Sequence, residues 1–233
     1  MSEVLERMRG GLVVSVQAPP GSPLAAPVHM AALARAAEAG GAVGIRAEGT
    51  GDVAAIRHAV SLPVIGLRKR NVAASDVYIT PTLDDALSVV AAGADLIAVD
   101  ATDRRRPEAG TGAAFVGALV RELGPRVLAD VDSVGAGVAA REAGAAAVAS
   151  TLAGYVGDAP PPAEPDLQLV ERLASELDCP VLAEGRYATP DHVRAALEAG
   201  AFAVVVGTAI TDPVALTRRF ADATRRSAHA SAR

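Results

Sequence analysis

Short runs of apolar and β-branched residues alternate along the whole chain with longer segments of helical spacing. Eight such runs begin near residues 11, 42, 63, 95, 126, 145, 180 and 201, and each predicts a buried strand. The segments between them repeat apolar residues three and four positions apart, which is typical of amphipathic helices. The chain therefore alternates strand and helix from end to end.

Four of the predicted helices end in nearly the same way. EAGGAV, AAGADL, EAGAAA and EAGAFA join a helix to the next strand at residues 38–43, 91–96, 142–147 and 198–203. Glycine at such a helix end predicts a left-handed residue, after which the strand resumes. Repeated units of this kind favour parallel βαβ structure.

Eight units in 233 residues favour a single (β/α)8 TIM barrel, an α/β fold with eight parallel strands. A doubly wound dinucleotide fold would need a GxGxxG turn after an early strand, and the first strand is not followed by one. We expect one domain over residues 1–233, with a flexible tail from about residue 225. The proline-rich segment at 158–166 follows the sixth strand and is either a stiff surface loop or a lid over the site.

Composition narrows the possible partners. A formal net charge of -5 and a pI near 5.4 argue against nucleic acid, because such binders usually carry a basic surface. Cys179 is the single cysteine, which excludes an intrachain disulfide and favours a reducing cytoplasm. No apolar run reaches the ~18 residues that cross a membrane. We expect no metal and no organic cofactor, since no metal-ligand cluster or dinucleotide motif occurs.

Polar residues follow most of the predicted strands. In a TIM barrel the carboxyl ends of the strands carry the active site, so these residues should converge there. They are Gln17, Arg46, Glu48, Lys69, Arg70, Asp100, Asp103, Asp130, Asp132, Glu184 and Arg186. The four histidines fall in predicted helices or in the tail, which argues against a catalytic histidine.

Lys69 and Glu184 are the candidates for proton transfer. Loss of solvation after an apolar strand would lower the pKa of Lys69 toward that of a general base. The alternative is an ammonium that reaches past the rim into water. Glu184 could serve as acid, base or hydroxyl anchor, or it could form an ion pair with Arg46 or Arg186.

Other charged candidates also have structural alternatives. Arg46 and Asp130 either orient a polyhydroxylated ligand or form a buried pair within the barrel. The run Arg104, Arg105 and Arg106 is either a solvated cluster or part of the mouth, and we expect Arg105 to be solvated.

Two glycine-containing segments are candidates for phosphate binding. Gly185 and Arg186 follow the seventh strand, and Gly207 and Thr208 follow the eighth. Glycine lets backbone N–H groups approach an anion, and a helix beginning after Ile210 would direct its positive end toward it. The alternative for Gly207 is a tight turn.

At these same residues the chain resembles the N-acylmannosamine-6-phosphate 2-epimerases (also called N-acylglucosamine-6-phosphate 2-epimerases). The resemblance runs nearly end to end, in the family's order, through GLVVSVQAPPGSPL, IRAEG, PVIGLRKR, YITPT, AVDATDRRRP, LADVDS, STLAGY, LAEGRYATP and VVVGTAITDP. It implies C2 epimerisation of N-acetylmannosamine 6-phosphate to N-acetylglucosamine 6-phosphate in sialic-acid catabolism, and it makes a homodimer plausible.

The resemblance also implies roles for the candidate residues. Lys69 would be the acid/base, with Glu184 binding substrate or returning the second proton. Gln17, Arg46 and Asp130 would orient the open-chain sugar. Gly185, Arg186, Gly207 and Thr208 would contact the phosphate. Either Glu184 supplies the second proton, or a substrate hydroxyl relays it to and from Lys69.

Two positions depart from the family pattern. Asp212 stands where the family pattern resembles AITRP and has an arginine, and a carboxylate there would repel a phosphate dianion. Backbone groups and Arg186 could suffice, another arginine such as Arg218 could compensate, or the substrate could lack phosphate at that place. Arg68 stands where an apolar residue is usual, and would lower the pKa of Lys69 if it pointed into the barrel.

These departures keep two further functions open. One is an epimerase or isomerase for a related sugar with altered phosphate recognition. The other is a phosphosugar-binding barrel without catalysis, against which the retention of Lys69 and Glu184 argues.

Overall fold

Eight parallel strands pair in chain order and close on themselves, because β1 pairs with β8. A computed structural model describes residues 2–107 and 110–230, and it describes side chains as far as residue 224. The strands are β1 (Leu12–Val16), β2 (Gly44–Glu48), β3 (Val64–Leu67), β4 (Leu96–Asp100), β5 (Val127–Asp130), β6 (Ala147–Ala149), β7 (Val181–Glu184) and β8 (Ala203–Val206). All eight predicted strands and the (β/α)8 TIM barrel are confirmed.

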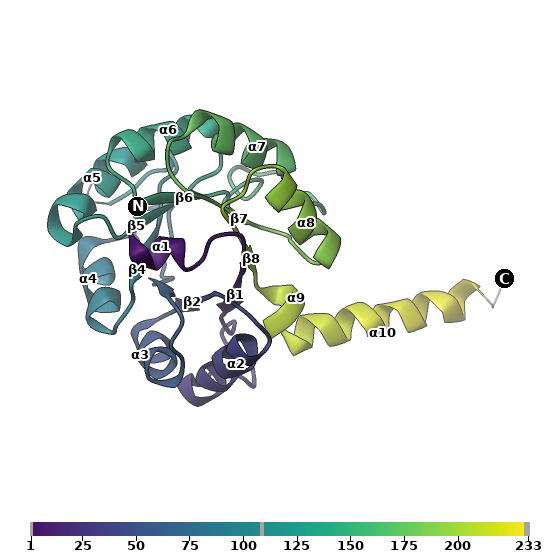
Figure 1. Ribbon diagram of the computed structural model, residues 1–233. Coiled ribbons are helices and arrows are strands. Elements are labelled where there is room, and N and C mark those ends of the chain that lie inside the picture. Colours follow the sequence, from purple (N-terminus) through teal and green to yellow (C-terminus); the bar gives the residue numbers. More distant parts are fainter. Residues whose placement is uncertain (1, 108–109, 231–233) are drawn as a thin grey trace.

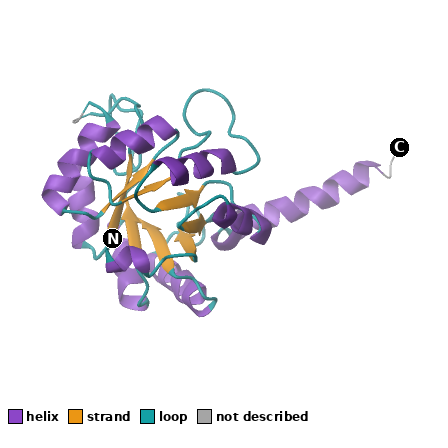
Figure 2. Cartoon of the chain, turned by 45° about the horizontal axis from the view of Figure 1, so that its top comes forward, coloured by secondary structure: helices purple, strands orange, loops and turns teal. Residues whose placement is uncertain are grey.

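A ring of helices surrounds the strands (Figures 1 and 2). The helices are α1 (Glu3–Glu6), α2 (Pro27–Ala39), α3 (Thr50–Ala59), α4 (Leu83–Ala91), α5 (Gly112–Leu123), α6 (Val134–Glu142), α7 (Leu167–Glu176), α8 (Pro190–Glu198), α9 (Thr208–Thr211) and α10 (Pro213–Ala230). Thr82, Thr111, Ser133 and Thr189 cap four of them, each accepting a hydrogen bond from the amide three residues on.

The repeated helix-to-strand junction has the predicted conformation. Gly41, Gly93, Gly144 and Gly200 have φ angles of 94°, 106°, 101° and 94° and follow the last turns of α2, α4, α6 and α8. A side chain would be strained there, so glycine at these positions sets the turn into each strand.

Side chains alternate between the inside and the outside of the barrel. Ile45 and Ala47 of β2 pack outward with the surrounding helices, whereas Val13 of β1 and Ile65 of β3 pack inside. The short helix α1 closes the amino end of the barrel, since its Leu5 belongs to the inner cluster. The polar side chains that point into the barrel lie at its opposite, carboxyl end.

Helix α10 runs away from the barrel (Figure 1), and the element it packs against most is α9. Residues 225–230 continue this helix, in the segment for which the sequence predicts a flexible tail, and residues 231–233 lie outside the described part. None of the described helices is long and apolar enough to span a membrane.

Candidate active site

Strand alternation brings one side chain from each of several strands into the carboxyl end of the barrel. Arg46 and Glu48 lie on the inward side of β2, opposite in direction to Ile45 and Ala47. By the same alternation Asp130 of β5 and Glu184 of β7 continue the inward series of Leu128 and Leu182. The predicted convergence therefore holds for these residues, whereas Arg70, which the same rule selected, pairs with Asp85 instead.

Arg46 is the centre of this polar layer and is fully buried. It donates two hydrogen bonds to Asp130, Nη1 to Oδ1 at 3.0 Å and Nη2 to Oδ2 at 2.6 Å. Its Nη1 also lies 2.9 Å from Oε2 of Glu184. One guanidinium thus holds two carboxylates, so the predicted buried pair is confirmed, while the ligand-orienting role of Arg46 stays a prediction.

Thr151 connects the same two carboxylates. Its hydroxyl lies 2.6 Å from Oδ1 of Asp130 and 3.1 Å from Oε2 of Glu184, and it can donate its single proton to one of them at a time. The residue follows β6 within the AAAVAST run, so the strand-end rule that selected the other candidates would also have found it.

Glu184 is poised to hold a proton near neutral pH. Its side chain is 14% exposed, and burial raises its pKa from the ordinary 4.5 to about 7, a rise that the nearby Asp130 charge reinforces and the Arg46 charge opposes. The carboxyl group can therefore both donate and accept a proton in the pH range of a cell.

Lys69 follows β3 and lies at the mouth, exposed to solvent. Enough protein surrounds the ammonium that loss of solvation lowers the pKa of Lys69, and the Arg46 charge lowers it further. Its backbone N–H donates a hydrogen bond to Glu48 Oε1 at 3.0 Å. Both sequence-based alternatives for Lys69 are thus partly right. The residue is exposed at the mouth of the barrel, and its pKa is nevertheless lowered.

A cavity of about 970 Å³ lies above this layer. Eight of the nine predicted site residues line it: Gln17, Arg46, Lys69, Glu184, Gly185, Arg186, Gly207 and Thr208. Asp130 does not line it, because it is completely buried and meets Arg46 and Thr151 instead. Asp130 is therefore connected to the cavity through Arg46 and Thr151, both of which line it.

Gln17 lines the cavity and has an unused acceptor. Its Nε2 donates to the Ser15 hydroxyl at 2.8 Å, while its buried Oε1 accepts no hydrogen bond within the described residues. A buried acceptor without a donor is costly, so a ligand N–H or O–H at this place would be stabilised.

Arg186 holds the loop after β6. Its Nε donates to the carbonyl oxygen of Glu164 at 2.8 Å, and its Nη1 donates to that of Ala153 at 2.6 Å. The guanidinium also lies over the Tyr155 ring, 5.2 Å from its centroid. The proline-rich segment at 158–166 is thereby tied to the cavity wall at Arg186.

The segment after β8 differs in detail from the prediction. A short helix, α9, already begins at Thr208, and α10 begins at Pro213, where a single helix beginning after Ile210 was expected. Gly207 packs closely against β1, since a Cβ there would lie 3.2 Å from that of Ser15. Gly207 therefore lies in the cavity wall in close contact with β1, and it leads directly into α9 and does not form a separate tight turn.

Asp212 lines the cavity and also caps α10. Its Oδ1 accepts a hydrogen bond from the Ala215 amide at 3.0 Å. A carboxylate at the first turn of a helix satisfies a free N–H group and interacts favourably with the helix dipole. The aspartate that stands in place of the family's arginine at position 212 therefore has a structural role as the cap of α10.

Two expectations about arginines need correction. Arg68 points away from the barrel interior, with Nε 3.6 Å from Oδ1 of Asp85, so it does not act on Lys69 as proposed. Arg104 and Arg106 are not part of a solvated cluster, because both turn inward and contact buried Asp100. Arg105 alone is exposed, as expected.

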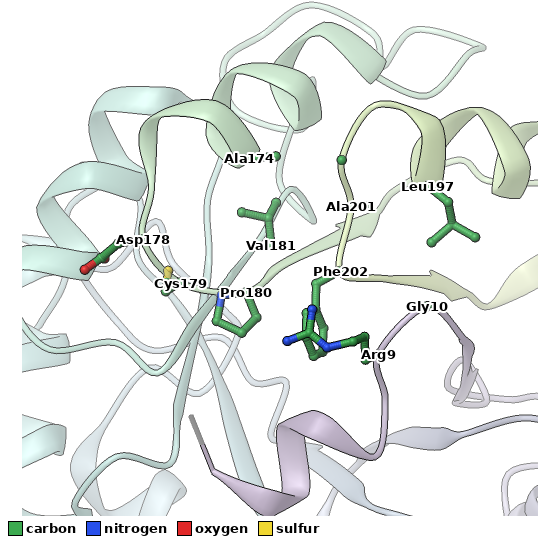
Figure 3. Close-up of a pocket in the computed structure, with 11 residues that line it drawn as sticks. Arg9, Gly10, Ala174, Asp178, Cys179, Pro180, Val181, Leu197, Ala201 and Phe202 are labelled. Carbon is green, nitrogen blue, oxygen red and sulfur yellow. The ribbon is translucent and has the colours of Figure 1, made fainter.

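A second cavity, of about 480 Å³, lies at the opposite end of the barrel (Figure 3). Pro180, Val181 and Phe202, at the amino ends of β7 and β8, line it together with Cys179, whose pKa burial raises to about 11. The charged residues that line this cavity are Arg9 and Asp178. No group of three or more potential metal ligands occurs among the described residues.

Comparison with known proteins agrees with this geometry. The family model described as "Putative N-acetylmannosamine-6-phosphate epimerase" matches residues 30–226. A "Putative N-acetylmannosamine-6-phosphate 2-epimerase" of Cutibacterium acnes is 49% identical over 224 residues, which are 95% of this chain and 97% of that protein. The chain belongs to this epimerase family.

Other members of the family extend the match. The N-acetylmannosamine-6-phosphate 2-epimerase from Clostridium perfringens has a solved structure with a TM-score of 0.89 and 36% identity, covering 95% of this chain and 96% of that one. The bifunctional enzyme NanE/NanK of Brucella melitensis is 45% identical over 231 residues, which are 99% of this chain and 44% of that protein. The predicted family and the isomerase class are thus confirmed.

Proposed function

We propose that this epimerase interconverts N-acetylmannosamine 6-phosphate and N-acetylglucosamine 6-phosphate by proton transfer at C2. The observation that carries the proposal is the pair of titratable groups in one cavity, Lys69 with a lowered pKa and Glu184 with a pKa of about 7. Environments that push the pKa values of neighbouring groups toward neutrality are typical of acid–base catalysis. The proposed substrate is the one for which the related epimerases are named.

The chemistry follows from the open-chain sugar. The C2 proton lies next to the C1 aldehyde, so its removal by neutral Lys69 gives an enolate-type intermediate. A proton returned to the other face inverts C2. We assign this second proton to Glu184, whose pKa suits delivery near neutral pH, in preference to relay through a substrate hydroxyl.

The remaining residues orient the sugar. Arg46 fixes Glu184 and is fixed in turn by Asp130, while Gln17 Oε1 accepts a hydrogen bond from a substrate N–H or O–H. Gly185, Gly207 and Thr208 form the wall where the phosphate binds, and Arg186 places the loop beside it. The proposed reaction uses no metal or organic cofactor.

The test is proton NMR of the protein with N-acetylmannosamine 6-phosphate in deuterated water. We expect conversion with deuterium at C2 in the wild type, and neither in Lys69→Ala. Arg68→Ala is the matched control, since Arg68 adjoins Lys69 but points outward to Asp85. A fully active Lys69→Ala would remove Lys69 from its role.

The proton route is tested in the same experiment with Glu184→Gln. If Glu184 returns the second proton, this variant should exchange the C2 proton of N-acetylmannosamine 6-phosphate without converting it. Unchanged conversion by Glu184→Gln would instead favour the hydroxyl relay.

Asp212 keeps a second candidate open, an epimerase for a related sugar that lacks the phosphate. A carboxylate in the cavity wall disfavours a dianion. Turnover of N-acetylmannosamine as fast as that of its 6-phosphate would support this candidate. Ligand binding without turnover of either sugar would support the non-catalytic barrel.

We also propose that the protein acts in the cytoplasm, where a reducing medium suits the free Cys179.

We further propose that the protein is a homodimer. Helix α10 extends from the barrel, and its Phe220 is 75% exposed, so a second copy of the chain would cover this side chain in an isologous contact. Phe220→Asp should lower the mass measured by light scattering to that of a monomer, whereas Arg218→Asp should not. A monomeric wild type would contradict the proposal.

A further inference from the structure

We infer that Arg219, on α10, supplies the positive charge that binds the substrate phosphate. The inference rests on the proposed function and names a phosphate-binding residue of the same cavity. Arg219 lines this cavity together with Gly207, Thr208 and Asp212. Arg218, the neighbour that the sequence suggested, does not.

The other cations of the cavity already have partners or roles. Arg46 is neutralised by the Asp130 and Glu184 carboxylates. Arg186 donates to two backbone carbonyl groups of the loop after β6. Within the part of the chain that the structure describes, no carboxylate lies within ion-pair distance of Arg219, which leaves its guanidinium available for an anion.

The cap at Asp212 places Arg219 at this wall. Because Asp212 accepts the Ala215 amide, the first turn of α10 is fixed beside the cavity. Residues 215 and 219 lie one turn apart on one face of the helix, and both line the cavity with Leu216. At ~1.5 Å per residue, Arg219 lies about 10 Å along the helix axis from Asp212. Its long side chain leans toward the start of α10, and so toward the wall formed by Asp212 and Gly207.

This arrangement changes how phosphate is recognised. A guanidinium can donate two parallel hydrogen bonds to phosphate oxygens, which a backbone amide cannot do. The charge comes from the second turn of α10, while Asp212 closes the first turn to an external anion. A sugar without phosphate would gain nothing from Arg219, so this residue selects for the phosphorylated substrate.

The test measures binding of inorganic phosphate by calorimetry, which does not depend on turnover, and KM values for N-acetylmannosamine with and without the 6-phosphate. Arg219→Gln should weaken phosphate binding by about tenfold or more, with only partial recovery in Arg219→Lys, which keeps the charge but not the paired hydrogen bonds, and no change in Arg218→Gln. KM should rise for the phosphorylated sugar alone.

The outcomes separate this inference from the proposed function. Equal phosphate affinity in Arg219→Gln and the wild type would overturn the inference while leaving epimerisation intact. A wild type that binds phosphate through Arg219 but converts neither sugar would support the inference and contradict the proposed function. A wild type that binds no phosphate would also overturn the inference.

Discussion

The Thr151 hydroxyl lies between two carboxylates, 2.6 Å from Asp130 and 3.1 Å from Glu184. Its hydrogen bond to Glu184 lowers the pKa of that carboxyl, against the burial that raises it to about 7. Thr151 therefore adjusts the pKa of the proposed acid, Glu184, without itself donating or accepting the proton of the reaction.

The proposed reaction should consequently have a bell-shaped pH dependence. Neutral Lys69 becomes more abundant as the pH rises, whereas protonated Glu184 becomes rarer as the pH passes about 7. Thr151→Val removes the hydrogen bond that lowers the pKa of Glu184, so the limb of the profile that Glu184 sets should move to higher pH. Thr151→Ser should keep the wild-type profile. A profile of kcat/KM that is identical in Thr151→Val would contradict the assignment.

Asp212 should be replaceable by asparagine but not by alanine. Asparagine keeps a side-chain oxygen for the Ala215 amide and removes the negative charge from the cavity wall. Asp212→Asn should thus bind inorganic phosphate several-fold more tightly, by calorimetry, at nearly unchanged stability. Asp212→Ala should lose about 1 kcal/mol of the cap, seen as a lower midpoint of thermal unfolding. Weaker phosphate binding by Asp212→Asn would mean that the carboxylate does not face the anion.

Arg186 should control the mobility of the loop after β6. Without its bonds to the Ala153 and Glu164 carbonyl groups, the segment should open more often. Arg186→Ala should therefore increase amide hydrogen exchange around residues 153–157, measured by mass spectrometry. Arg172→Ala, which removes an exposed arginine on α7 that pairs with Glu176, is the control and should change nothing in the loop. Equal exchange in both variants would show that the loop is held by other contacts.

Gly112 should be essential for packing at the start of α5. A Cβ there would lie 2.3 Å from the carbonyl oxygen of Ala101, a backbone atom that cannot move aside. Gly112→Ala should reduce the free energy of unfolding by about 2 kcal/mol or more in urea titration. Gly117→Ala, in the same helix with no neighbour closer than 3.7 Å, should instead raise it by about 0.5–1 kcal/mol. Similar stability changes in the two variants would contradict this reason.

The barrel and most of its polar layer could be predicted because both follow from local periodicity. A strand that alternates every two residues fixes which side chains enter the barrel, so Arg46, Lys69 and Glu184 were found from their places at strand ends. Asp130 follows the same rule, yet its depth below the cavity depends on contacts with Arg46 and Thr151 that no spacing specifies.

Long-range geometry instead determines the position of Arg219, the contacts of Arg186 with the loop after β6, and the inward turn of Arg104 and Arg106. The sequence does not show where α10 leaves the barrel, so it offered Arg218 only as an example of a compensating arginine, whereas Arg219 is the one that lines the cavity. Nor does a run of three arginines reveal that buried Asp100 draws two of them inward.

The Thr211 hydroxyl donates a hydrogen bond to the carbonyl oxygen of Ser15 at 2.8 Å, across 196 positions of the chain. The wall of the cavity beside Gly207 therefore exists only after β8 has met β1. During synthesis, a chain that has already made Lys69 and Glu184 still lacks this wall until its last strand emerges from the ribosome. Ring closure joins the most distant segments at the greatest cost in chain entropy, so it should be among the slow steps of folding and the step at which binding ability first arises.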